Sequence, residues 1–592
     1  MKKILFVVVA LVMALCAFPM TGCNGNKDGE EGGTEYTGNE TELRVGVWDG
    51  GLGHEWLNKV KTEFEKKYAD VSFQEGRTGV RVKLNPSKTN MLGEKVESAI
   101  DLNQDAEDIY FTCYFTGTPY IFQNRSLNIT DAVEQKVYLA NGELADMEWD
   151  AESGKLKLKD GAEAPTKSIA DKMTDDNRTG YYTSAETLAG SDHEEGYYAL
   201  PFENSLSGFI YDHDLFENEG WLDYDGIDGL PDTMDDFFDL LDRICDADMI
   251  PFTFSRSVSY YWGGICDAFL AQYEGHENAE LDYTLNGTYT FPANTFDSGT
   301  VTEENITVNA DGTQTVAITR DNGWMLAHTP GKAELIKFMR RLCTPKYYDQ
   351  KLYDSLYDEN YKLPAQNFIL SSLGKKGQKR IAMLYEGEWW ENENRTQFNY
   401  TGGYGTRDFR FFPLPYIDGQ KDPDQRTVAD YSRGVDLFVN AKTQKAALSK
   451  LFLQFVHSES SLETFTIETG ITRMYDYDLS EEQLKNVSKF GQNVYKIKMT
   501  KNSGVTITAS RANLVADPFW TQFQMGYGGY VVSDVAGDGT AWDFYTHPNL
   551  YFVNNAGVNG TAYKDAQSFI DGMYRFYGKE KWTAKLDAWQ SV

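Results

Sequence analysis

The chain has 592 residues, and its 89 Asp and Glu outnumber its 56 Lys and Arg, which gives a formal net charge of −33 at pH 7. This acidic balance argues against nucleic acid as a partner, because nucleic-acid binding requires basic patches. It also disfavours electrostatic adsorption to anionic lipid. The length predicts two or more domains or lobes.

The start of the chain has the pattern of a secretory signal. Two lysines open it, an apolar run fills positions 4–18, and small residues precede Cys23. That run is shorter than a typical membrane span. Residues 1–22 are therefore expected to be removed. The position of Cys23 resembles the bacterial lipoprotein cleavage box, although Met20 and Thr21 depart from its commonest residues. This resemblance implies acylation of Cys23, with palmitate as the expected type of fatty acid; the alternative is a plain secreted protein.

Residues 23–41 predict a flexible tether. They are rich in Gly, Asn and Glu and contain almost no apolar side chains, so they cannot bury a core. With a lipid on Cys23, the chain is expected to be a globular body from about Leu43 to Val592. That body would be held to the outer, extracellular face of the cell membrane.

The cysteines indicate neither a metal site nor a disulfide framework. Of the six, Cys16 leaves with the signal and Cys23 takes the lipid. The remaining four are widely separated, and no pair has metal-ligand spacing. Buried free thiols are favoured, with one disulfide left open as an alternative in an exported protein. No metal or cofactor is expected. These four are Cys113, Cys245, Cys266 and Cys343.

Strand-like and helix-like patterns alternate in the first part of the body. Strands are predicted by β-branched alternation, and helices by apolar residues at helical spacing. The predicted order is strand Leu43–Trp48, helix Trp56–Tyr68, strand Val80–Leu84, helix Met91–Leu102 and strand Asp108–Phe111. This order predicts a parallel α/β sheet, in which ligands gather beyond the carboxyl ends of the strands. Those ends carry Trp48, Asp49, Tyr114 and Phe115. The glycines between residues 50 and 53 lack the dinucleotide-binding spacing.

The stretch Tyr197–Phe216 consists of two apolar, strand-like halves joined by a polar break. The break contains Glu203, Asn204 and Ser205. Such a pattern predicts a crossover from one globular unit into another, and small-molecule sites concentrate in clefts between units. The alternative is an ordinary loop between two strands of one domain.

The rest of the chain alternates further helices and strands with two insertions. Residues 141–195 are polar and acidic, and residues about 275–325 are Thr-rich and predict a β-hairpin. Predicted elements are helices Pro231–Ala247, Lys332–Leu342, Lys445–Val456 and Asp565–Tyr577, and strands Ile250–Phe254, Arg380–Leu384, Phe409–Pro415 and Gly434–Val439. A further helix is opened by Tyr261 and Trp262, and another lies near Trp582.

Five segments in order resemble one protein family. They are LRVGVWDGGLGHEWLNKVKTEFEKKY, YALPFENSLSGFIYDHDLF, LPDTMDDFFDLLDRICDADMIPFTFS, KRIAMLYEGEWW and SRGVDLFVNAKTQKAALSKLFLQFVHSESSLETF. Together they resemble the extracellular solute-binding proteins of bacterial sugar-importing ABC transporters, the maltose-binding-protein-like group. The resemblance covers most of Leu43 to Phe465, excludes both insertions, and is loose beyond about residue 475.

The resemblance implies an α/β fold of two lobes, periplasmic-binding-protein-like, with a cleft between them and three hinge crossings. The crossings are expected near Asn204, Asp408 and Asn440. The first lobe would comprise 42–204 plus 409–440, and the second 205–408 plus 441–592. The implied function is capture of a carbohydrate, expected to be an oligosaccharide, by hinge closure and its delivery to ABC permease subunits. The protein is expected to act as a monomer.

A sugar site needs aromatic faces for C–H patches and polar groups for hydroxyls. Trp389, in GEWW, matches a position where the family commonly places a stacking aromatic, whereas Trp390 is expected to be structural. For any one tryptophan the alternative is core packing. For Asp49 and Glu203, expected at the cleft mouth, the alternatives are capping or a solvated loop. The predicted ligand-binding set is Trp48, Asp49, Tyr114, Glu203, Asn204, Ser205, Trp262, Trp389, Arg433 and Trp520.

Two other functions fit the sequence less well. Glu386 and Glu388 could form a glycosidase acid pair, but they lie on one side of one strand, whereas catalytic carboxylates must flank the scissile bond. No Ser-His-Asp arrangement and no HExxH motif is present, so we expect no catalytic residues. The third class is a glycan-binding adhesin on the cell surface that is not coupled to transport.

Overall fold

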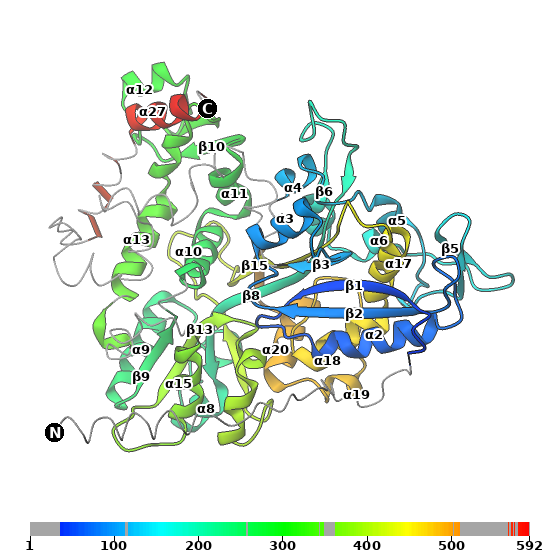
Figure 1. Ribbon diagram of the computed structural model, residues 1–592. Helices are drawn as coiled ribbons and strands as arrows, with labels where there is room; N and C mark the ends of the chain where they lie inside the picture. The colour runs from blue at the N-terminus through cyan, green and yellow to red at the C-terminus, as the bar shows by residue number, and fades with distance from the viewer. Residues whose placement is uncertain are drawn as a thin grey trace, which may run out of the picture.

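The computed structural model describes residues 36–112, 117–255, 259–342, 344–348, 362–500, 503–509, 566–567, 570–571, 574 and 578–590. These residues form two α/β lobes that share one continuous sheet (Figure 1). Its strand order is β2-β1-β3-β15-β8-β13-β9, with β14 on β8 and β16 (Thr506–Ala509) on β15. The expected α/β, two-lobed fold is confirmed.

The first lobe begins with the predicted parallel strands and their helices. Strands β1 (Thr41–Trp48), β2 (Val80–Ser87) and β3 (Ile109–Thr112) pair in parallel. Helices α2 (Glu55–Lys67) and α3 (Gly93–Leu102) connect them. Helix α2 buries the stripe Trp56, Leu57, Val60 and Phe64, which recurs at helical spacing as the sequence predicts.

Two long antiparallel strands join the lobes. Strand β8 (Leu200–Asp212) leaves the first lobe, and strand β15 (Thr427–Val439) returns to it beside β3. Their register slips between Tyr431, opposite Ser205, and Val435, opposite Glu203, so that β15 carries extra residues there. Such an irregularity disrupts the ladder locally and bends the strand. It falls at the polar break that the sequence predicts as a crossover.

The second lobe contains the remaining half of the sheet. Strands β13 (Ile381–Gly387) and β14 (Phe409–Phe412) are antiparallel to β8, and β9 (Ile250–Phe254) is parallel to β13. Helices cover both faces: α9 (Met234–Asp246), α10 (Ser259–Glu274) and α13 (Pro330–Leu342) on one, and α15 (Leu363–Ser371) and α20 (Lys489–Met499) on the other.

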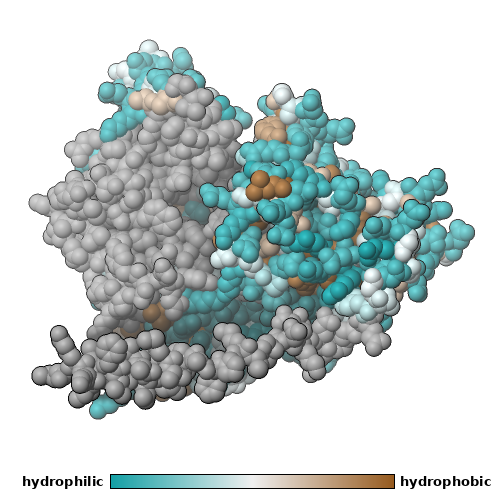
Figure 2. Space-filling view, in the orientation of Figure 1, coloured by the Kyte–Doolittle hydropathy of each residue, from teal (hydrophilic) through white to brown (hydrophobic). Residues whose placement is uncertain are grey.

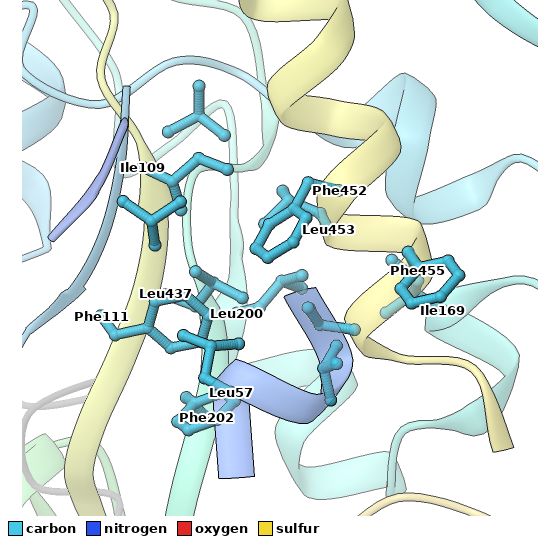
Figure 3. Close-up of a cluster of buried hydrophobic side chains, with 14 of the residues drawn as sticks. Leu57, Ile109, Phe111, Ile169, Leu200, Phe202, Leu437, Phe452, Leu453 and Phe455 are labelled. Carbon is cyan, nitrogen blue, oxygen red and sulfur yellow. The ribbon is translucent and has the colours of Figure 1, made fainter. Parts of the chain in front are cut away.

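The lobes have separate cores. The first core gathers side chains from α2, β3, β8, β15 and α17 (Ala446–Val456), among them Leu57, Phe111, Leu200, Leu437 and Phe452 (Figure 3). In the second lobe, Phe209 and Tyr211 of β8 enter one cluster while Leu206 and Ile210 enter another. This alternation follows the period of two along a strand, because successive side chains point to opposite faces.

The cores divide the chain differently from the predicted boundaries. Strand β14 pairs with the second-lobe end of β8, so the predicted crossing near Asp408 is not a passage between lobes. Helices α17 and α18 (Glu459–Thr469), expected in the second lobe, pack in the first core. The third passage follows α18, because Tyr475 lies in the first core and Phe490 in the second lobe. Local periodicity locates an element but does not show which core buries it.

The two insertions form small sheets of their own. Residues 141–195 contain the hairpin β4 (Met147–Asp150) and β5 (Lys155–Leu158), helices α6 (Ile169–Lys172) and α7 (Asp175–Tyr181), and β6 (Tyr182–Thr183), which pairs with β7 (Gly196–Tyr197). The other insertion is antiparallel, in the order β10 (Gly287–Phe291), β12 (Gln314–Ile318) and β11 (Thr307–Val308). Near its end, the Trp582 indole of α27 (Lys579–Gln590) donates to the Arg320 carbonyl at 2.6 Å.

The remaining elements are short. They are α4 (Thr118–Phe122), α5 (Thr130–Glu134), α8 (His213–Glu219), η1 (Ile227–Gly229), α11 (His276–Thr284), α12 (Ser298–Glu303), η2 (Gly323–His328), η3 (Pro345–Tyr347), α16 (Trp390–Glu393), η4 (Arg395–Tyr400) and α19 (Glu481–Leu484). In the space-filling view the first lobe presents a mostly hydrophilic face with scattered apolar residues (Figure 2). Within the described residues, no helix has both the length and the apolar character that a membrane span needs.

Candidate functional site

Most of the predicted site residues that the structure describes lie where the lobes meet, and the loop after β1 forms one side of this junction. The Gly53 amide donates to the Gly50 carbonyl at 3.1 Å, which closes a tight turn. Asp49 lies 2.9 Å from His54 Nδ1, and both side chains remain about one-third exposed. Trp48 is half-buried and its ring folds over Gly50. Trp48 and Asp49 are therefore held at the carboxyl end of β1, where solvent reaches them.

Trp389 is buried rather than exposed to a ligand. Its side chain is 8% accessible, belongs to the first core, and packs directly on Gly51. Burial, and next the nearby Glu393, raise the pKa of Glu386 well above its ordinary value, while hydrogen bonds from the Gly387 amide and the Trp389 side chain oppose that rise. The adjacent Trp390 is fully buried in the second lobe, as expected for a structural residue.

Glu388, the residue before Trp389, forms a buried ion pair. Lys498 of α20 contacts Glu388 Oε1 at 2.6 Å, with both side chains fully buried, and donates to the Thr472 carbonyl at 2.6 Å. The Glu388 amide donates to the Leu206 carbonyl at 2.8 Å. Burial raises the pKa of Glu388, and the Lys498 charge opposes that rise. The pair thus connects the end of β13 to both β8 and the third passage.

Glu203 and Ser205 lie inside the hinge and not at a cleft mouth. Both are buried, and the Ser205 hydroxyl donates to the Glu203 carboxyl. Burial raises the pKa of Glu203 to about 8. A carboxyl with this pKa is largely protonated at neutral pH, so it can occupy the junction without the cost of an ionised buried group. The expected position of Glu203 is therefore corrected: the polar break folds inward between two strands.

The sequence reasoning missed Arg473, a fully buried cation next to the crossing strand. Its guanidinium lies 4.2 Å from the Phe202 ring centroid and donates to the Pro201 carbonyl at 3.3 Å. Arg473 Nη2 also lies 2.9 Å from His457 Nε2, while His457 Nδ1 lies 2.8 Å from the Leu453 carbonyl. His457 is therefore neutral, with its proton on Nδ1; burial and then the Arg473 charge lower its pKa well below the ordinary value. An arginine just after a helix gave no local signal of this role.

For several predicted site residues the structure does not describe the side chain. The structure describes only the backbones of Asn204, Trp262 and Arg433, which run in β8, α10 and β15. Cys23, Tyr114 and Trp520 lie outside the described residues. Of the four mature cysteines, Cys245 is half-buried and Cys266 is buried, both as free thiols, and Cys113 and Cys343 lie outside the described residues.

Glu386 and Glu388 do not have the geometry of a glycosidase acid pair. Glu388 is fully buried against Lys498, so it is not placed to flank a bound sugar from solvent. In the described part of the chain, no group of three or more His, Cys, Asp and Glu is arranged to hold a metal ion. A separate shallow hollow on the second lobe, between Tyr211, Arg410 and Lys496, contains none of the predicted site residues.

Comparison with known proteins agrees with this architecture. Residues 55–327 match the family described as "Bacterial extracellular solute-binding protein". The apo-form of RafE from Streptococcus pneumoniae is 12% identical, with a TM-score of 0.51 over 92% of this chain and 99% of that chain. A "probable secreted solute-binding lipoprotein" from Streptomyces coelicolor is 11% identical, with a TM-score of 0.50 over 90% of this chain and 98% of that chain. No curated protein matches significantly.

The fold is therefore that of a two-lobed solute-binding protein. The resemblance read from the sequence, to bacterial extracellular solute-binding proteins, is confirmed by the family match over residues 55–327, and the two structures agree with it in fold.

Proposed function

We propose that this protein captures a carbohydrate, and within that class an oligosaccharide, between its lobes and delivers it to the permease of an ABC importer. The observation that carries this proposal is the junction itself: polar and aromatic groups from both lobes meet where two strands and a third passage connect them. The solute-binding family match supports capture of a solute. The resemblance of five segments to the sugar-importing group supports carbohydrate as its class.

Hinge closure is the proposed mechanism. The extra residues of β15 opposite the polar break of β8 interrupt the shared ladder, so bending is expected there. Closure would bring second-lobe groups toward Trp48 and Asp49, and only the closed state would complete contacts from both sides. Of the predicted ligand-binding set, Trp389 is proposed to act by supporting the loop after β1, and Glu203 and Ser205 through the hinge. The other members remain the proposed ligand contacts. The proposed location is the outer face of the cell membrane, through a lipid on Cys23.

A thermal-shift and calorimetric screen tests the function. The probes are raffinose, stachyose, maltotriose, xylotriose and chitotriose, each at millimolar concentration. We expect at least one to raise the melting temperature, because a ligand that binds only the folded state stabilises it. Small-angle scattering with that sugar should show a smaller radius of gyration. Absence of any shift across the panel would refute carbohydrate capture. Binding with an unchanged radius would favour the adhesin, and release of shorter sugars on chromatography would favour the hydrolase.

A further inference from the structure

The segment from Trp389 to Arg395 is the second lobe's contact with the loop that follows β1. It leaves strand β13, and its first tryptophan enters the first core whereas its second enters the second lobe's core. Asn392, three residues after Trp389, is half-buried and donates from Nδ2 to the Gly51 carbonyl at 2.8 Å. The second lobe thus holds the main chain of a first-lobe loop.

The direction of the Asn392 amide is fixed by its other partner. Arg395 Nη2 donates to Asn392 Oδ1 at 2.8 Å, and the same guanidinium donates to the Glu468 carbonyl of α18. A guanidinium only donates, so the amide oxygen must face Arg395 and the amide nitrogen must face Gly51. The hydrogen bond to Gly51 is therefore part of a chain that begins on a first-lobe helix.

Gly51 is also a point of close approach. A Cβ placed there would lie 2.7 Å from Trp389 Cβ, so the loop backbone rests directly on this side chain. The loop Asp49–Gly53 contains three glycines, which lose more conformational freedom on ordering than other residues. Such a loop gains its single conformation from contacts outside itself, and Asn392 and Trp389 supply them.

We propose that Asn392 is a positioning residue, which sets the loop Asp49–Gly53 from the opposite lobe and thereby places Trp48 and Asp49 for the ligand. The functional part of this inference rests on the proposed carbohydrate capture. Trp389 supports the same loop by packing against Gly51. The loop that carries Trp48 and Asp49 is thus held in place by contacts from both lobes. A change at Asn392 therefore weakens binding through this loop and not through a contact between Asn392 and the ligand.

Asn392→Asp tests the placement without a ligand. Aspartate keeps the shape and the Arg395 contact, but an ionised carboxylate cannot donate to the Gly51 carbonyl. The readout is amide hydrogen exchange at Asp49 and Gly53, whose amides donate to Ser87 and Gly50. We expect exchange about five- to tenfold faster, the effect of losing roughly one hydrogen bond.

Asn218→Asp is the control, because the exposed Asn218 donates from Nδ2 at 2.7 Å to the Asp214 carbonyl of its own second-lobe helix and not to the first lobe. Equal acceleration in both variants, or none in Asn392→Asp, would overturn the placement. Gly51→Ala perturbs the same contact from the other side, since its Cβ must displace Trp389. It should accelerate exchange in the same loop.

Calorimetry with the best-binding sugar of the panel tests the functional part. We expect Asn392→Asp to weaken affinity by about fivefold or more and Asn218→Asp to leave it unchanged, with the melting temperatures of the two variants as the check on folding. Faster loop exchange with unchanged affinity would overturn the positioning role. If no sugar in the panel binds, the carbohydrate proposal and this functional role both fail, whereas the exchange result still decides whether Asn392 holds the loop.

Discussion

Trp389 and Trp390 are adjacent in sequence but are buried in the cores of different lobes. Trp389 packs on Gly51 in the first core, and Trp390 contacts the rings of Phe409 and Phe490 in the second lobe. One peptide bond therefore links the two lobes a short distance beyond strand β13. This arrangement makes the segment that follows β13 a part of the junction between the lobes.

Trp389→Ala should cost stability as well as affinity. Truncating a buried aromatic to Ala typically costs about 3–5 kcal/mol of unfolding free energy, and the loop on Gly51 would lose its support. Thermal unfolding and calorimetry on the same variant measure both quantities. Trp390→Ala is the control, since it should lower stability by a similar amount and leave the loop in place. A thirtyfold loss of affinity with an unchanged melting temperature would instead make Trp389 a stacking residue, as its sequence position implies.

Glu203 should make the protein less stable as pH rises. Burial raises its pKa from 4.5 to about 8, so the folded state binds a proton that the unfolded state releases between these values. The stability that this proton contributes is complete below about pH 4.5 and is lost as pH rises through about 8. Glu203→Gln, which keeps an acceptor for Ser205, should flatten the fall in melting temperature between pH 5 and 8. Burial also raises the pKa values of Glu386 and Glu391, so part of the fall in melting temperature should remain in Glu203→Gln.

The control for this pH experiment is the exposed Glu152, whose replacement by Gln should leave the pH profile unchanged. An identical slope in the wild type and in Glu203→Gln would show that Glu203 is ionised in the folded protein.

Lys498→Met should destabilise the protein strongly. It leaves the Glu388 carboxyl buried without its cation, and breaking a buried pair by removing one partner costs about 3–5 kcal/mol. The double variant Glu388→Gln with Lys498→Met should recover most of that loss, because no charge is then left buried. Urea unfolding of the two single variants and the double variant measures the coupling. Near-additive losses would mean that the two charges do not interact.

Cys23→Ala should release the protein from the membrane or leave its signal unprocessed. The proposed lipid is carried by this one thiol, and the tether that follows contains almost no apolar residues that could replace it. Fractionation of cells and the mass of the mature chain measure the outcome. Membrane retention with normal processing would refute the lipoprotein proposal. Cys245→Ala serves as the control, since Cys245 lies in the folded second lobe.

The sequence by itself determined the local elements and the class of fold. Alternation in Leu43–Trp48 and helical spacing from Trp56 to Tyr68 gave β1 and α2 close to their observed bounds. The apolar halves around Glu203 gave the crossing strand β8, and the ordered segments gave the two-lobed family. These features are local: period, breaks and residue type act over one element and are visible without the rest of the chain.

Only the tertiary structure decided which lobe buries each element and which way the junction residues face. A polar break such as Glu203–Ser205 has the same pattern whether it is solvated or enclosed, and its burial depends on β15, more than two hundred residues away. Asn392 and Gly51 are separated by 341 positions, so no local period connects them. Burial and long-range hydrogen bonding depend on which segments pack together, and that choice is made by the whole chain because it minimises the free energy of all contacts at once.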